Sequence, residues 1–102
     1  MNERLFKAIS DPARRQIFHM VFMTSAISIT AIATKFDISR QAISRHIKIL
    51  EEADLLEIKK QGRERICSAN PKPFKALIDW SSFYMNFWNN KIDNLDNYLS
   101  DH

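Results

Sequence analysis

Residues 38–66 read ISRQAISRHIKILEEADLLEIKKQGRERI, and the first half of this stretch decides the fold. On a helical wheel with about 100° per residue, it separates into an apolar face and a polar face. The apolar face contains Ala42, Ile43, Ile47, Ile49, Leu50 and Ala53, and the polar face contains Arg40, Gln41, Ser44, Arg45, Lys48, Glu51 and Glu52. Because serine is favoured as an N-cap, the pattern predicts an amphipathic helix from Ser39 to about Ala53.

The polar face of this helix carries one row of aligned side chains. Gln41, Ser44, Arg45 and Lys48 follow the spacing i, i+3, i+4, i+7. Guanidinium and amide groups can meet base edges and phosphates, and a small hydroxyl allows close approach. A solvated charged face is the ordinary alternative, so the neighbouring segments must decide between the two interpretations.

A shorter helix is predicted just upstream. Ser28 or Thr30 can cap it, and its apolar positions are Ile29, Ile32, Ala33 and Phe36. Asp37, Ile38 and Ser39 then suit a turn, in which Ile38 is expected to fill the space between the two helices. A helix, a short turn and a second helix form a helix-turn-helix, here over about residues 29–53.

Two short strands are predicted downstream, at 55–60 and 64–68, within a hairpin of about 55–69. Leu56 and Ile58 alternate with polar residues, and Gly62, the one glycine of the chain, lies where a hairpin tip can require a positive φ. Basic residues surround this tip, namely Lys59, Lys60, Arg63 and Arg65. A basic hairpin beside a basic helix suggests a second contact with duplex DNA.

The segments at the two ends of the chain are predicted to form scaffold and dimer. A first helix over about Glu3–Ile9 has an apolar side, and Asp11 and Pro12 suit the N-cap and first position of a second helix. Ala13, Ile17, Met20 and Val21 recur at helical spacing in that second helix and are expected in the core.

The last predicted helix, about 73–99, is the longest and the most apolar. One seam has heptad spacing, with Phe74, Ile78, Ser81, Met85, Trp88, Ile92, Leu95 and Leu99. A second stripe contains Leu77, Trp80, Tyr84 and Phe87, and it could alternatively line a pocket for an apolar effector. A chain of this size is too small to bury both stripes alone. We therefore expect a homodimer formed by Leu5, Phe6, Ile9, Ile78, Met85, Trp88, Ile92, Leu95 and Leu99.

Two stretches of the chain resemble the ArsR-type winged helix-turn-helix transcriptional regulators of bacteria. They are SDPARRQIF at 10–18 and the stretch 38–66 quoted above. The resemblance implies a mainly α fold with a small β-hairpin wing (α+β), in the order α-α-α-α-β-β-α, that dimerises through its first and last helices. Asp54 departs from the pattern, since the family usually has glycine there, and aspartate tolerates a left-handed conformation better than most residues.

The resemblance also bears on metal binding. Metal sensors of the family carry paired cysteines where this chain has Ser28 and Thr30. Its one cysteine and three histidines lie far apart in the sequence, so we expect no metal and no cofactor. The segment LIDWSSFYMNFWNNKIDNLDNYL at 77–99 resembles a subgroup that does not sense metals, which implies repression of its own or a neighbouring operon.

Two isolated residues have a structural and a functional interpretation. His46 lies near the edge of the apolar face of the second helix, where packing or a phosphate contact is expected rather than catalysis. Cys67 is expected to be a small, partly buried thiol rather than a redox switch, although the sequence does not decide this.

Composition limits the remaining possibilities. The 102 residues indicate a single domain over 1–102, and the net charge of +3 is compatible with a nucleic-acid surface. No apolar run reaches the roughly 18 residues of a membrane span, and the N-terminus leads into an amphipathic helix, so a cytoplasmic protein is expected. Glycine-rich phosphate loops, carboxylate clusters and Ser-His-Asp patterns are absent, so no catalytic residues and no enzyme are expected.

The sequence therefore predicts a homodimeric DNA-binding regulator, most simply a repressor, on a palindromic operator. The expected DNA contacts are Ser39, Arg40, Gln41, Ser44, Arg45, His46, Lys48, Lys60, Arg63 and Arg65. An alternative is a protein-interaction module whose basic row meets an acidic partner. The sequence does not identify the operator, the regulated genes or a small-molecule effector.

Overall fold

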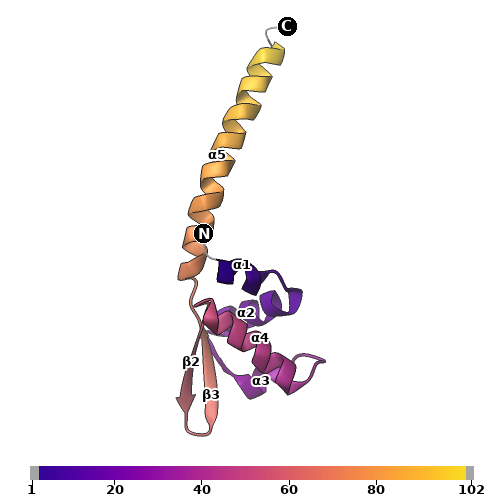
Figure 1. Cartoon of the computed structure of the whole chain (residues 1–102), viewed down its shortest axis with the longest axis vertical. Coiled ribbons are helices and arrows are strands. Elements are labelled where there is room, and N and C mark those ends of the chain that lie inside the picture. Colours follow the sequence, from indigo (N-terminus) through magenta and orange to yellow (C-terminus); the bar gives the residue numbers. More distant parts are fainter. Residues whose placement is uncertain (1–2, 101–102) are drawn as a thin grey trace.

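The computed structural model describes the backbone of residues 3–100 and the side chains of residues 3–94. Its elements, in order, are α1 (Glu3–Ile9), α2 (Pro12–Thr24), β1 (Ala26–Ser28), α3 (Ile29–Ala33), α4 (Arg40–Glu52), β2 (Leu56–Gln61), β3 (Glu64–Ala69) and α5 (Lys72–Ser100). Figure 1 shows that α1–α4 and the strands form one body, from which α5 projects. The molecule is therefore elongated, at 69 × 25 × 23 Å.

The hydrophobic core lies within this body. Its buried residues are Leu5, Ala8, Ile17, Val21, Ile29, Ile32, Ile43, Ile47, Leu50, Ala53, Leu55, Leu56 and Cys67. Among the described side chains, α5 adds only the partly buried Phe74 and Leu77 to this cluster. The helix-turn-helix and the base of the hairpin thus share one core, and most of α5 lies outside it.

The sheet has three strands, whereas the sequence predicted two. Its order is β1-β3-β2, and both pairings are antiparallel. In β1, Ile27 pairs with Cys67 of β3. The expected order α-α-α-α-β-β-α therefore lacked one strand. Three residues are too few to show an alternating pattern, and β1 forms because β3 offers a free edge to it.

The helix-turn-helix differs from the expectation in its first helix and turn. The Ser28 hydroxyl accepts a hydrogen bond from the Ala31 N–H at 3.0 Å, so Ser28 rather than Thr30 is the N-cap. Helix α3 ends at Ala33, which places Phe36 in the turn, where it still packs against the core. Ile38 is 43 % exposed, so the expectation that it fills the space between the helices is wrong.

The connection between α1 and α2 follows the expected capping. An Asp11 carboxylate oxygen accepts hydrogen bonds from the N–H groups of Ala13 at 2.8 Å and Arg14 at 3.3 Å. Ile17 and Val21 are fully buried, and Ala13 and Met20 are partly buried. These contacts fix the start of α2 and the face that it turns to the core.

One residue assigned to the dimer surface belongs to the core instead. Leu5 is 1 % exposed in its own protomer, because α1 turns this side chain toward α2 and α4. Its neighbour Phe6 is 41 % exposed and contacts Trp80 edge to face, with ring centroids 6.4 Å apart. Leu5 is therefore removed from the predicted dimer surface, and Phe6 remains on it.

The long helix α5 leaves a wide apolar surface uncovered. Its 29 residues span about 43 Å at 1.5 Å per residue. Large apolar side chains on it are 41–67 % exposed, namely Ile78, Trp80, Phe83, Tyr84, Met85, Phe87, Trp88 and Ile92. Leu95 and Leu99, which were also predicted for the dimer, lie outside the described side chains.

Positive φ angles occur at two positions that the sequence suggested. Asp54 has φ 60°, at the position where the resembled family has glycine, and Gly62 at the hairpin tip has φ 62°. A Cβ placed on Gly62 would meet nothing within 4 Å. Backbone conformation, rather than lack of space, therefore favours glycine at the tip.

We predict that Asp54→Gly stabilises the fold by about 0.5–1 kcal/mol, because glycine adopts a left-handed conformation without steric cost. The hydrogen bond from Asn70 Nδ2 to the Asp54 carbonyl, at 2.9 Å, is kept because it involves the backbone. Gly62→Ala is the matched control and should destabilise by about 1 kcal/mol. Urea unfolding at fixed protein concentration measures both, and a loss of stability in Asp54→Gly would contradict the assignment.

Candidate nucleic-acid interface

The orientation of α4 is set by its cap and its apolar stripe. The Ser39 hydroxyl accepts a hydrogen bond from the Ala42 N–H at 3.1 Å, as a serine N-cap does. Ile43, Ile47 and Leu50 are at most 1 % exposed, and α4 packs against α1, α2, α3 and β2. With one side held in the core, the opposite side of the helix must face outward.

The outward side carries the polar row that the sequence predicted. Arg40, Gln41, Ser44, Arg45 and Lys48 are all exposed. In the described part of the chain, no hydrogen bond or ion pair engages the side chains of Arg40, Gln41, Arg45 or Lys48. These groups are therefore available to an external anion or hydrogen-bonding surface.

The hairpin of β2 and β3 lies beside this row. A groove of about 390 Å³ separates them and is lined by Ile29, Ser44, Arg45, Ile47, Lys48, Glu51, Ile58 and Arg65. A second hollow, of about 250 Å³, is lined by Ile29, Thr30, Arg40, Ser44, Arg63, Glu64 and Arg65. The structure thus places basic residues of helix and hairpin along the same grooves.

The pairing register assigns Lys60 to the face that borders α4. Lys60 pairs directly with Arg65, and it lies two residues after Ile58, so all three share one face of the sheet. Lys59 lies on the opposite face and forms an exposed ion pair with Glu57 at 3.8 Å. The hairpin side chains that lie with the α4 row are therefore Lys60 and Arg65, with Arg63 at the tip.

His46 does not belong with this row. It is partly buried, and its Nδ1 lies 3.4 Å from Nη1 of Arg14 on α2. Position 46 faces the N-terminal part of α2 rather than the outward side of α4. The structure shows the packing interpretation, and this orientation of His46 does not favour the DNA contact that the sequence predicted for it.

Arg14 and Arg15 connect the start of α2 to the end of α1, a role that the sequence did not predict. Arg14 donates hydrogen bonds from Nε to the Ala8 carbonyl at 2.9 Å and from Nη2 to the Lys7 carbonyl at 2.8 Å. Arg15 donates from Nη1 to the Ile9 carbonyl at 2.6 Å. The last carbonyls of α1 lack partners within their own helix, and the two arginines supply them. Because both arginines follow closely after the predicted end of the first helix and the predicted N-cap Asp11, the sequence could have indicated this role.

Asp11 completes this junction. Burial alone would raise the pKa of Asp11, but the N–H groups of Arg14 and Ala13 and the charges of Arg14 and His46 outweigh it. The net effect is a lowered pKa. The carboxylate therefore stays ionised and keeps its role as N-cap of α2.

Cys67 is fully buried at the centre of the sheet, although the sequence suggested only partial burial. Burial raises the pKa of its thiol to about 11, and the charge of Glu51 contributes in the same direction. Across the described residues, no three His, Cys, Asp or Glu side chains gather at metal-binding distance. Cys67 thus behaves as a core side chain.

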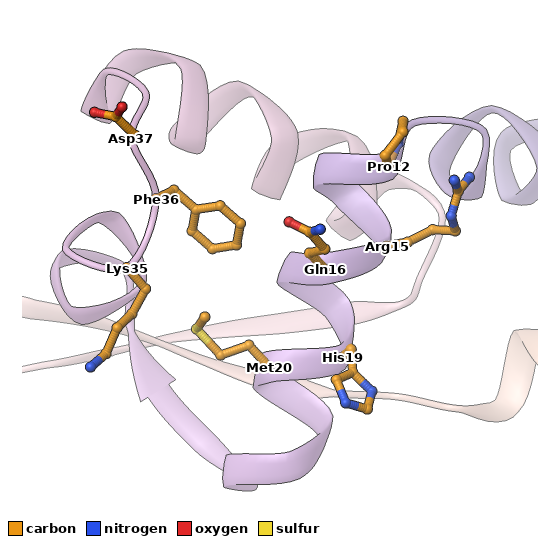
Figure 2. Close-up of a pocket in the computed structure, with 8 residues that line it drawn as sticks. All are labelled: Pro12, Arg15, Gln16, His19, Met20, Lys35, Phe36 and Asp37. Atoms are coloured by element: carbon orange, nitrogen blue, oxygen red, sulfur yellow. The ribbon is translucent and has the colours of Figure 1, made fainter.

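A further hollow, of about 690 Å³, lies between α2 and the turn that follows α3. Figure 2 shows Gln16, Met20 and Phe36 turned into it, whereas Arg15, His19 and Lys35 extend in different directions. Because its charged groups do not converge, this hollow lacks the arrangement that a small-molecule site needs. The grooves beside α4 are therefore the better candidate site. The helix-turn-helix of α3 and α4, followed by the hairpin of β2 and β3, defines a winged helix-turn-helix protein.

Comparison with known sequences supports this class. A family described as a helix-turn-helix domain matches residues 9–59. Transcriptional repressor SdpR of Bacillus subtilis (strain 168) is 32% identical, over 86% of this chain and 97% of the relative. The uncharacterized HTH-type transcriptional regulator YuzN of the same strain is 33% identical, over 74% of this chain and 89% of the relative.

Solved structures show the same architecture. An ArsR family transcriptional regulator superimposes with a TM-score of 0.77 at 28% identity, over 84% of this chain and 88% of that one. An ArsR-like regulator from Rhodococcus sp. RHA1 has a TM-score of 0.82 at 24% identity, over 97% and 90%. The chain belongs to the helix-turn-helix family and is a transcriptional regulator of the ArsR type. Within the described residues, no helix is both long and apolar enough to cross a membrane.

We predict that Cys67 in the folded protein resists alkylation. With a pKa of about 11, the thiol at pH 8 is only about a thousandth ionised, and the thiolate is the reactive form. Iodoacetamide at pH 8 should modify the native chain at least about a hundredfold more slowly than the urea-unfolded chain. Mass spectrometry follows both reactions, and equal rates in the two states would contradict burial of the thiol.

Proposed function

We propose that the chain acts as a homodimeric repressor that binds a palindromic operator in double-stranded DNA. The observation that carries this proposal is the unengaged polar row of α4, held outward by three buried side chains and bordered by the basic face of the wing. The major groove of B-form DNA is wide enough for an α-helix, so α4 fits there. The wing residues then meet the neighbouring phosphates.

Each exposed side chain has a role that follows from its chemistry. Arg45 suits the O6 and N7 acceptors of guanine, and Gln41 suits the N6 and N7 groups of adenine. Phosphate contacts are assigned to Ser39, Arg40, Ser44, Lys48, Lys60, Arg63 and Arg65. Base contacts set the sequence preference, whereas phosphate contacts set affinity and its salt dependence.

Dimerisation through α1 and α5 accounts for the uncovered apolar surface. Ile78, Met85, Trp88 and Ile92 recur at steps of seven, three and four, and all are at least 41 % exposed. Such spacing keeps one seam against a partner helix. Phe6 extends this surface onto α1, next to Trp80. A two-fold dimer would place two α4 helices in successive major grooves, with half-sites about one turn of DNA apart.

Repression is the output that the relatives favour. SdpR is named a transcriptional repressor, and this chain matches 97% of its length. A dimer that occupies a promoter excludes polymerase without any further chemistry. Repression of its own or a neighbouring operon follows as the specific form of this proposal.

The proposal is tested by selecting bound fragments from genomic DNA with the purified chain, and by measuring affinity for the selected site across salt concentrations. A palindromic consensus and a steep salt dependence, with a slope of about −0.9 per phosphate contact, are expected. An enriched site without symmetry would contradict the two-fold dimer. An absence of enrichment with no salt dependence would contradict DNA binding and favour an acidic protein partner.

Two single substitutions separate base reading from phosphate contact. Arg45→Ala should cost about 1–3 kcal/mol on the selected site and broaden its sequence preference, because a bidentate base contact is lost. Lys60→Ala should weaken specific and random duplexes by similar factors and reduce the salt slope by about 1. Fluorescence anisotropy measures both, with Lys75→Ala on α5 as the control. Equal losses on specific and random DNA would remove Arg45 from base reading.

A substitution on α5 tests the dimer. Trp88→Asp should give a folded monomer, because Trp88 is 59 % exposed and lies outside the core. Binding to the palindrome should weaken about a hundredfold or more, because separate monomers, rather than one dimer, must then bind the two half-sites. Asn86→Asp adds the same charge on the polar side of α5 and should stay dimeric. Analytical ultracentrifugation distinguishes the two, and a dimeric Trp88→Asp would contradict the proposed seam.

A further inference from the structure

Arg14 lies at the junction of three helices. Its side chain is only 11 % exposed and belongs to α2, yet it donates to two carbonyls at the C-terminal end of α1. The remaining nitrogen, Nη1, lies 3.4 Å from His46 Nδ1 on α4 and 3.9 Å from an Asp11 carboxylate oxygen. One guanidinium thus contacts both the end of α1 and the helix that carries the exposed polar row.

The chemistry of this contact fixes the state of the histidine. Arginine has only donors, so a hydrogen bond between these two groups requires that His46 Nδ1 accepts and that the ring proton is on Nε2. His46 follows Arg45 directly and lies about 100° around the helix from it. The buried Ile43, Ile47 and Leu50 set the outward direction of α4, and the Arg14 contact adjusts the position of the adjacent Arg45 relative to the end of α1.

We propose that Arg14 and His46 are positioning residues that refine the placement of α4, already oriented by the core, relative to the C-terminal end of α1. His46 contributes to DNA binding through Arg14 and touches no DNA itself. This inference rests on the proposed function, in which α4 reads DNA and α1 takes part in the dimer. In that dimer, the contact between Arg14 and His46 would join α4 of each protomer to α1, and α1 helps to set the spacing between the two α4 helices.

Four variants test the contact. His46→Gln keeps an acceptor for Arg14, whereas His46→Leu is similar in bulk and has none. Arg14→Lys keeps the charge but cannot hold two α1 carbonyls and His46 together. The double variant Arg14→Lys with His46→Leu closes a thermodynamic cycle. Urea unfolding identifies any variant whose fold is lost, and His46→Gln keeps the test valid if Arg14→Lys does not fold.

Affinity for the selected palindrome should fall about tenfold in His46→Leu and stay within about twofold of wild type in His46→Gln, because only the former loses a direct contact. The double variant should lose no more than the larger single effect. An affinity of His46→Leu equal to that of wild type, or equal losses in Leu and Gln variants, would overturn the proposal. If the wild-type chain binds no DNA at all, the proposed function is wrong. The contact between Arg14 and His46 is then tested by the ¹⁵N spectroscopy of His46, which does not need DNA.

The spectroscopic test does not depend on DNA. Ring ¹⁵N chemical shifts of His46 in the folded wild-type chain should show an unprotonated Nδ1 and a protonated Nε2 at neutral pH. Arg14→Lys should shift the Nδ1 resonance and leave that of His19, an exposed residue on α2, unchanged. A proton on Nδ1 in the wild-type chain would overturn the proposed contact, since two donors would then face each other.

Discussion

The structure depends on the burial of three side chains on one helix. Ile43, Ile47 and Leu50 of α4 are held between α1, α2, α3 and β2. Full burial of each stabilises the fold by about 1.5–3 kcal/mol, so the helix cannot turn about its axis without a large loss. Because the three follow the 3.6-residue period, the exposed polar row is fixed by the same contacts. The core therefore determines both the stability of the domain and the direction in which the exposed polar side chains of α4 point.

Helix α5 contributes little to the core of its own protomer. The buried core, as described, ends at Cys67, and α5 adds to it only at its base. The rest of α5 presents large apolar side chains that the same protomer does not cover. Such a surface is unusual for an isolated small domain, and the proposed homodimer would cover it. The junction of Arg14 with the end of α1 then connects this region to α4.

Local signals in the sequence predicted much of the fold and of the candidate site. Ser39 and Asp11 cap helices as expected, and Asp54 and Gly62 have the positive φ angles that their positions suggested. Each of these depends on a few neighbouring residues, which the sequence displays directly. The exposed polar row of α4 followed from helical periodicity in the same way.

Most of the errors concern contacts between distant segments, and one concerns the packing of a turn. Strand β1 exists because β3 offers an edge some forty positions away, and Leu5 is buried because α2 and α4 pack over it. His46 turns toward Arg14, 32 positions earlier, and Ile38 lies exposed in its turn. Periodicity gives the faces of a helix, but it does not say which other element covers each face.

Methylation interference on the selected operator would show whether α4 enters the major groove, because it reports the groove in which the protein contacts the bases. Methyl groups on guanine N7 lie in the major groove, and those on adenine N3 lie in the minor groove. If α4 lies in the major groove of each half-site, guanine N7 methylation should block binding in two symmetric clusters about one helical turn apart. Binding that is blocked only by adenine N3 methylation, or by neither modification, would contradict the insertion of α4 into the major groove.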